Sequence, residues 1–503
     1  MKRARSVALF ATLFATCALA HVGSPDIYLD GKAGPYQVFV TIRPPQVIPG
    51  VAELEVRSES AGVAQVRALP LQLSRTRADY PPTPDVLKQS PQDKQFFTGS
   101  LWLMSDGSSQ IRILVDGDKG AGVLSVPVPS IALTTRKMQW QLAAVLCVMG
   151  LLLVGGLVAI AGAAVREAKL NAGVAADPLR TRNGRIAMSI AFVIVAMVLW
   201  GGKTWWDGEA AIYQKRIYKP LNMTAAFDSS QAGVLNLDLT DPGWMQPNPK
   251  GVLSRIFFVR KIDDLVPDHD HLMHLYAIRE PGLDVIYHLH PALASSGKFR
   301  LSLPAMPAGD YKLYADVVHD NGLPETLTSM LHLPDGVPGA EGRALSGDDA
   351  TAVAQPVESA PLPDSFTLPD GYKMVWVRDG SALHARQGMA FHFRLLTPDG
   401  KAPQDMAFYM GMLGHAAFVK TDGSVFAHIH PNGTVSMAAF ELAQAQAGQT
   451  MTDMPRMAGM PGMDLPNEVS FPYGFPTAGR YRIFVQMKHG QTVETGVFDA
   501  RAE

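Results

Sequence analysis

Two copies of a His-x-His-Pro motif lie in the second half of this 503-residue chain, with His288 and His290 in the first copy and His428 and His430 in the second. On a strand, side chains at positions i and i+2 point to the same face, so each motif predicts two neighbouring imidazoles. Imidazole suits Zn²⁺ and copper, and each pair needs a third or fourth ligand from elsewhere in the fold. The alternative is a strand end whose histidines only hydrogen-bond to loop backbone.

The motifs belong to a longer repeated pattern. In each copy an Ala-Gly-x-Tyr motif follows, at 308–311 and 478–481, and a further histidine comes ten residues after its glycine. A histidine also precedes each His-x-His-Pro motif, by 14 residues in the first copy and 13 in the second. Matching offsets indicate two homologous modules. The predicted metal ligands are His274, His288, His290 and His319 in the first copy, and His415, His428, His430 and His489 in the second. His269 and His271 have no sequence counterpart in the second copy, and they are either auxiliary ligands or solvated loop residues.

Methionines recur every third residue near the end of the chain, at Met451, Met454, Met457, Met460 and Met463. Two prolines and two glycines in the same segment exclude a helix. An extended, polyproline-like segment has three residues per turn and would line all five thioethers along one side. Thioether sulfur is a soft ligand that selects Cu(I) over Zn²⁺, so we expect a copper site here. A flexible apolar loop that caps the fold is the alternative.

Two apolar segments predict membrane helices. Residues 138–165 carry no charge over 28 residues, more than the roughly 20 that a spanning helix needs. A second uncharged run, 186–202, is followed by Lys203 and flanked by tryptophans that suit the membrane interface, so we expect a span over 186–206. The connection 166–185 carries five cations, which predicts that it lies in the cytoplasm and that both large regions lie outside.

The N-terminal residues are those of an exported protein. Basic residues precede an uncharged stretch, 6–20, that ends in Ala-Leu-Ala. This pattern is typical of a secretory signal peptide over residues 1–20, whose cleavage would leave His21 at the N-terminus. We therefore expect a protein of the inner (cytoplasmic) membrane, with two spans in its lipid and with both large regions in the periplasm.

Composition excludes several classes of function. The formal charge is −2 and no block of Lys or Arg occurs, so nucleic acid is not expected as a partner. The two cysteines both lie in apolar runs, so we expect neither a disulfide framework nor the cysteine ligand of a blue-copper site. No HExxH, GxSxG or CxxCH motif occurs, and we do not expect an enzyme.

The expected fold class is mainly β, with three extracytoplasmic β-sandwich modules, Ig-like or cupredoxin-like, plus two transmembrane helices. Short alternating or β-branched runs, at 36–42, 51–56, 111–115 and 122–128, indicate strands of the first module. A stretch rich in Pro, Gly, Ala and acidic residues separates the two repeats. The predicted boundaries are 21–137 for the first module, 221–334 for the His-rich first repeat, 335–366 for the linker and 367–503 for the His- and Met-rich second repeat.

The chain resembles bacterial envelope proteins that carry YtkA-like or FixH-like β-sandwich modules. The matching residues are the mature start His21-Val22-Gly23-Ser24-Pro25, then Gly34-Pro35-Tyr36, and Val115-Asp116-Gly117-Asp118-Lys119-Gly120. The His-x-His-Pro and Ala-Gly-x-Tyr elements look like those of related metal-handling modules, and the Met-rich segment is similar to methionine motifs of periplasmic copper-resistance proteins. An N-terminal histidine also resembles the copper sites of those proteins, although residues 22–137 offer no second histidine. The resemblance implies handling of copper or heavy metals, or assembly of a metalloenzyme.

Two functions are compatible with these patterns. The first is a membrane-anchored periplasmic metal-binding protein, a copper chaperone, buffer or resistance factor that binds Cu(I) or Cu(II), with zinc as a second candidate metal. The second is a non-catalytic scaffold or metalloenzyme-assembly protein that binds a protein partner without metal. The expected partners are the lipid of the inner membrane and envelope proteins of copper handling or metalloenzyme assembly.

Overall fold

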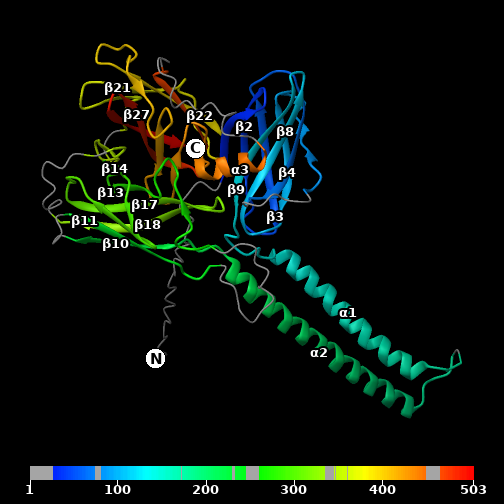
Figure 1. Cartoon of the computed structure of the whole chain (residues 1–503). Helices are drawn as coiled ribbons and strands as arrows, with labels where there is room; N and C mark the ends of the chain where they lie inside the picture. The colour runs from blue at the N-terminus through cyan, green and yellow to red at the C-terminus, as the bar shows by residue number, and fades with distance from the viewer. Residues whose placement is uncertain are drawn as a thin grey trace, which may run out of the picture.

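The computed structural model describes residues 26–73, 81–171, 173–228, 233–244, 260–334, 345, 347–358, 361–448 and 465–503. Figure 1 shows a body built of strands, from which the helices α1 (Trp140–Glu167) and α2 (Pro178–Arg216) project side by side. The expected signal peptide, His21 and the five regularly spaced methionines lie outside the described residues.

The N-terminal region packs two antiparallel sheets against each other. Its first sheet has the order β1 (Ile27–Ala33), β2 (Tyr36–Arg43), β3 (Gly50–Ser58), β7 (Phe96–Leu103) and β6 (Lys88–Gln89). The second has the order β5 (Asp85–Val86), β4 (Val63–Gln72), β8 (Gly107–Gly117) and β9 (Gly120–Ser130). Alternate residues of β3 are buried, as the alternating pattern of 51–56 predicts, and they form one core with residues of β4, β8 and β9.

Both projecting helices are long and apolar enough to cross a membrane, with 28 and 39 residues, and their most apolar windows are not buried inside the protein. The helix α2 begins earlier than the expected span 186–206. Asp177 caps it by accepting a hydrogen bond from the backbone N–H of Arg180 at 2.7 Å, and Pro178 suits the first helical position. The connection between the helices is therefore shorter than the predicted 166–185.

The first repeat also pairs two sheets. One has the order β10 (Asn222–Asp228), β11 (Val234–Thr240), β16 (Lys298–Ser302) and β15 (Ala292–Ser295). The other has the order β12 (Leu265–Val266), β17 (Gly309–His319), β13 (His274–Glu280), β14 (Val285–Leu289) and β19 (Ala350–Val353), with β18 (Pro324–Leu333) on β17. The strand β19 lies within the predicted linker 335–366, so part of that segment completes the sheet of the first repeat.

The second repeat has the same arrangement. One sheet has the order β20 (Ser365–Thr367), β21 (Lys373–Val377), β22 (Met389–Leu396) and β26 (Glu468–Tyr473). The other has the order β23 (Met406–Ala407), β27 (Gly479–His489), β24 (His415–Lys420) and β25 (Phe426–Ile429), with β28 (Thr492–Ala502) on β27. The order β23-β27-β24-β25 repeats β12-β17-β13-β14 of the first repeat. This shared order matches the homology that the spacing of the motifs predicts.

The two repeats pack against each other through a separate apolar core. Tyr276 and Tyr314 of the first repeat meet Phe426 of the second, and the rings of Tyr314 and Phe426 stack at 4.3 Å between centroids. The second repeat also contacts the N-terminal region, where its helix α3 (Met437–Gln446) lies against β9. Figure 1 shows α3 between the two parts of the body. Three parts of the chain therefore meet near residues 428–440.

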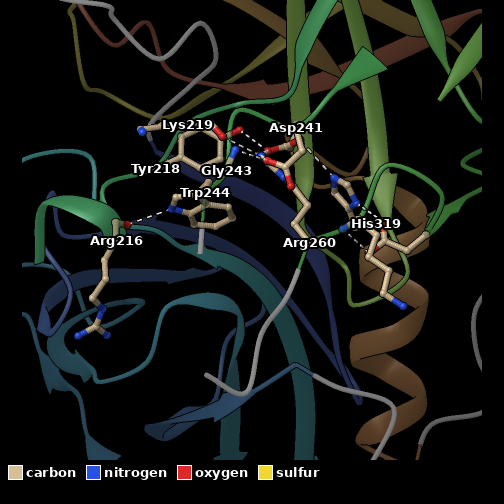
Figure 2. A network of polar contacts seen from close by, with 11 residues as sticks. Arg216, Tyr218, Lys219, Asp241, Gly243, Trp244, Arg260 and His319 are labelled. Carbon is tan, nitrogen blue, oxygen red and sulfur yellow. Dashed lines mark hydrogen bonds and ion pairs between the residues drawn. The ribbon is translucent and has the colours of Figure 1, made fainter. Parts of the chain in front are cut away.

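The end of α2 is attached to the body on two sides. The Arg216 guanidinium pairs with Asp106 of the N-terminal region. The Arg216 carbonyl accepts a hydrogen bond of 3.0 Å from the indole of Trp244, as Figure 2 shows. The end of α2 therefore contacts both the N-terminal region and the first repeat.

Candidate metal centre

The strands of the two repeats carry their histidines to one place. His274 begins β13 and His288 lies in β14, while His415 begins β24 and His428 lies in β25. The residues between the paired histidines, Leu289 and Ile429, point into the cores of their own repeats. Each His-x-His pair therefore faces away from its own core, toward the neighbouring repeat.

Ring nitrogens gather in two triads. One triad consists of His274, His288 and His290, all from the first repeat, and one nitrogen of each lies within 4.8 Å of the others. The other consists of His269, His415 and His430, and again one nitrogen of each lies within 4.8 Å of the others. The second triad is shared, because His269 of the first repeat reaches two histidines of the second.

Two further histidines join the triads into one group. The ring of His428 lies 5.4 Å from those of His274 and His415, between centroids. The ring of His271 stacks on that of His290 at 3.8 Å. We call this set the histidine cluster, and its members are His269, His271, His274, His288, His290, His415, His428 and His430.

One nitrogen of each paired histidine is held by a neighbour. Nδ1 of His288 lies 2.9 Å from the side-chain oxygen of Gln486, and Nδ1 of His428 lies 3.3 Å from Asp316. Each of these two contacts joins one repeat to the other. Asp316 and Gln486 hold equivalent positions in their repeats, because Asp316 pairs with His274 across the sheet and Gln486 pairs with His415. In the same way, Nδ1 of His290 lies 3.0 Å from Asp349, and Nδ1 of His430 lies 3.0 Å from the carbonyl of Val435. Such contacts fix the ring and leave Nε2 for a ligand role.

Most of the opposite nitrogens lack partners, although Nε2 of His288 lies 3.2 Å from Nδ1 of His274. Within the described residues, no hydrogen bond reaches Nε2 of His269, His290, His428 or His430, or either ring nitrogen of His415. Nearly all buried polar groups in proteins are hydrogen-bonded, since an unpaired one costs about 1–3 kcal/mol. Five imidazoles in one buried place therefore each have at least one ring nitrogen that is available to bind a further partner.

Burial favours the neutral form of six imidazoles of the cluster. Desolvation, with the charge of His430 beside it, lowers the pKa of His269 to about 4, and desolvation lowers that of His430 to about 4. Desolvation and the neighbouring histidines hold the pKa values of His274, His288, His415 and His428 well below the usual range. Neutral imidazole is the form that coordinates metal. Burial also raises the pKa of the Asp316 carboxyl to about 7.

A cavity of about 160 Å³ opens beside the cluster. His271, His274, His428 and His430 line it, together with Asp26 and Pro127 of the N-terminal region. All three parts of the body therefore border the route by which a small ligand could reach the imidazoles.

Six of the eight predicted histidine ligands thus lie together, and two lie elsewhere. His319 contacts Asp264 and Glu325, and the network around it includes Arg260, as Figure 2 shows. His489 lies among Asp370, Asp405 and Glu494. Each of the two histidines ends its strand, three residues beyond the position that faces the cluster (Asp316 or Gln486), so it belongs to the opposite face.

His269 and His271, which the motif spacing leaves outside the repeat, are members of the cluster. Their turn has a counterpart in the second repeat, because the bridge between Asp268 and His271 matches that between Tyr409 and Met412. His269 and Met410 both have φ of +50°, a conformation that non-glycine residues rarely adopt. The counterparts of His269 and His271 are therefore Met410 and Met412. The spacing of the histidines missed this equivalence because the second copy has methionine at both positions.

Comparison with known proteins adds little about function. A family model described as a domain of unknown function (DUF8832) matches residues 250–331 and 367–503, which include all eight histidines of the cluster. No curated protein matches the chain.

Solved structures show only remote similarity. A tetra-tandem repeat from the extending region of a large adhesion protein is 9% identical, with 91% of this chain and 72% of that chain covered and a TM-score of 0.15. Dimeric latent PorU from Porphyromonas gingivalis is also 9% identical, with 91% and 32% covered and a TM-score of 0.15. Similarity at this level carries no argument about this protein.

Proposed function

We propose that this protein is a membrane-anchored metal-binding protein whose histidine cluster holds copper. The observation that carries the proposal is the set of buried imidazoles whose Nδ1 atoms are fixed by neighbours and whose Nε2 atoms have no partner among the described residues. Ligand histidines in metal sites have this arrangement, because the contact at one nitrogen orients the other toward the ion. The alternative of purely structural histidines leaves these nitrogens unpaired at a cost that a bound ion would remove.

Two features favour copper over zinc. Imidazole binds both metals, so the cluster itself does not separate them. The turn that supplies His269 and His271 in the first repeat supplies Met410 and Met412 in the second. Met410 is buried, yet it belongs to none of the apolar cores of the described residues. Thioether sulfur suits Cu(I) and not Zn²⁺, and the Met-rich segment 451–463 offers five more soft ligands in the same repeat.

The wider setting of the site is part of the proposal. We place the apolar helices α1 and α2 in the inner membrane with both large regions in the periplasm, as the cation-rich connection predicts. The three pairs of sheets are then β-sandwich modules of the Ig-like or cupredoxin-like kind, related to YtkA-like and FixH-like modules. A buried site beside an open cavity suits a protein that holds copper and exchanges it with another copper-handling or metalloenzyme-assembly protein of the envelope.

Copper binding can be tested on the full-length protein in detergent micelles. We expect the parent protein to retain Cu(I) after dialysis, and the variant His288→Ala/His428→Ala to lose most of it. The variant His332→Ala/His384→Ala is the matched control, since His332 and His384 are exposed histidines of the same two repeats. Metal content measured by mass spectrometry gives the stoichiometry.

X-ray absorption of the copper-loaded parent provides a second measurement that does not depend on any variant folding. We expect scattering from imidazole rings around the copper. Equal copper content in both double variants, or a copper environment without imidazole, would remove the cluster from the site. If the parent protein binds no metal, the better explanation is the alternative function, a scaffold that binds a protein partner without metal.

A further inference from the structure

A buried network in the first repeat surrounds the cation Arg260. Its guanidinium lies 2.6 Å from Glu325 and 2.9 Å from Asp241, and the side chains of Arg260 and Glu325 are 0% exposed. Glu325 also contacts Nε2 of His319 at 3.2 Å, and Asp264 contacts Nδ1 of the same ring. Figure 2 shows Arg260 between Asp241 and His319. Two cationic side chains therefore face three carboxylates here.

The second repeat has two of these three acidic residues in the same places. His319 pairs with Leu265 across the sheet, and His489 pairs with Met406, so Asp264 and Asp405, one residue earlier, are equivalent. Glu325 stands opposite Val317, and Glu494 stands opposite Met487, each two residues before the histidine. A further carboxylate, Asp370, comes from the turn between β20 and β21 and lies 3.5 Å from His489. The second repeat therefore places one histidine among three carboxylates.

The cation is what the second repeat lacks. Arg260 stands four residues before Asp264, and the residue four positions before Asp405 is Lys401. Lys401 is 80% exposed and pairs with Asp399 instead. Within the described part of the chain, Asp370, Asp405 and Glu494 form ion pairs with His489 and with no lysine or arginine. Negative charge that Arg260 balances in the first repeat is therefore left without a buried cation in the second.

The imidazole of His489 is oriented as a ligand. Asp405 lies 3.4 Å from Nδ1, on one side of the ring, while Asp370 and Glu494 each lie 3.5 Å from Nε2, on the other side. His489 is 9% exposed, its ring stacks on Tyr372 at 4.2 Å, and Nε2 has no hydrogen-bond partner among the described residues. One ligand atom of each of Asp370, His489 and Glu494 lies within 4.8 Å of the others.

We propose that Asp370, His489 and Glu494 bind a divalent cation, in the place that Arg260 occupies in the first repeat. Asp405 is a positioning residue, since a carboxylate on Nδ1 fixes the ring of a metal-bound histidine. One imidazole with two carboxylates suits Mn²⁺ or Zn²⁺, whereas the imidazoles of the histidine cluster suit copper. The bound cation would join the turn β20–β21 to the hairpin β27–β28. This site does not depend on the copper proposal.

Manganese is the probe that separates this site from the histidine cluster, because Mn²⁺ prefers carboxylate oxygen. We titrate the metal-free full-length protein in detergent with Mn²⁺ and follow the electron paramagnetic resonance signal of the free ion. The parent is expected to bind one Mn²⁺ per chain, with Zn²⁺ as a competitor. Asp370→Asn/Glu494→Gln is expected to weaken Mn²⁺ binding at least 100-fold, and Asp405→Asn about 10- to 100-fold.

Three controls make the result decisive. Asp399→Asn/Asp422→Asn removes the same charge from exposed positions of the same repeat and should leave Mn²⁺ binding unchanged. His288→Ala/His428→Ala should also bind Mn²⁺ like the parent, so a failure of the copper site and a failure of this site give different results. Mn²⁺ should raise the melting temperature of the parent and not that of Asp370→Asn/Glu494→Gln. A parent that binds no Mn²⁺, or a variant Asp370→Asn/Glu494→Gln that binds it equally well, would overturn the proposal.

Discussion

At the scale of single residues, the histidines of this protein fall into two electrostatic classes. Those of the cluster are buried or half-buried beside one another, and desolvation lowers the pKa values of His274, His288, His415 and His428 and brings those of His269 and His430 to about 4. Burial also opposes protonation of His319, but hydrogen bonds to Asp264 and Glu325 outweigh it and raise the pKa of His319 to about 9. The imidazole is thus kept neutral where other imidazoles surround it and charged where it lies between Asp264 and Glu325.

The two classes predict opposite effects of pH on the metal-free protein. Cluster histidines take up protons first in the unfolded chain, near pH 6.5, so the free energy of unfolding falls as pH drops from about 6.5 toward 4. His319 gives stability that is complete below about pH 6.5 and is lost as pH rises through about 9. We expect the melting temperature to fall by on the order of 5 °C between pH 7 and pH 5.

Thermal denaturation of the metal-free protein across this range measures the effect. His269→Gln should reduce the fall on acidification, because one titrating group is removed. His319→Gln should instead reduce the fall in melting temperature that the parent shows above pH 8. A melting temperature that stays constant or rises from pH 7 to pH 5 would contradict the low pKa values of the cluster.

At the scale of elements, the packing of α1 and α2 depends on glycine. A Cβ at Gly162 would overlap the side chain of Met188, and a Cβ at Gly184 would lie 3.1 Å from the carbonyl oxygen of Gly162. Both glycines are buried, and no other described residue of the two helices is. Small residues are what allow apolar helices to approach closely in a membrane.

We therefore expect Gly162→Leu to separate the two helices. The connection between them should then be cut by trypsin several-fold faster, since Arg180 currently donates a hydrogen bond to the Ala168 carbonyl across it. Gly155→Leu is the matched control, because a Cβ at Gly155 meets nothing within 4 Å. Equal rates of cleavage in the two variants would show that the helices do not rely on this contact.

At the scale of the whole molecule, the histidine cluster belongs to neither repeat alone. His269 of the first repeat completes the triad of His415 and His430, and Gln486 of the second repeat holds the ring of His288. The apolar core between the repeats, with Tyr276 and Phe426, fixes this arrangement. Copper affinity should therefore depend on contacts between repeats as well as on the ligands.

Gln486→Leu tests this dependence. The side chains are similar in size, so the change removes the hydrogen bond to His288 and keeps the packing. We expect copper affinity to fall about 10- to 100-fold, the usual effect of losing a contact that orients a ligand. Gln404→Leu, on an exposed loop of the same repeat, should bind copper like the parent. Competition with a chelator of known affinity gives both values. Equal affinities would assign the orientation of His288 to packing and to the Tyr409 hydroxyl, which lies 3.2 Å from the same nitrogen.

Residue types and their spacing were enough to predict candidate ligands and the local strand geometry. The spacing of His288 and His290 placed both rings on one face, because strand periodicity is a property of the backbone and needs no tertiary information. Repeated offsets identified the equivalent residues of the second copy. The apolar runs likewise predicted the helices α1 and α2, although capping by Asp177 moved the start of α2.

Which of these residues contact one another depends on the tertiary structure. His319 and His489 follow their motifs at matching offsets, yet strand register turns them to the other face, and register depends on pairing with distant strands. His269 and His271 join the cluster because the two repeats pack face to face, which no local pattern encodes. The missing cation beside His489 is visible only when the two repeats are superposed by strand order. Contacts between elements far apart in sequence arise from packing of whole surfaces. Sequence patterns could therefore predict candidate ligands but not which of them lie together.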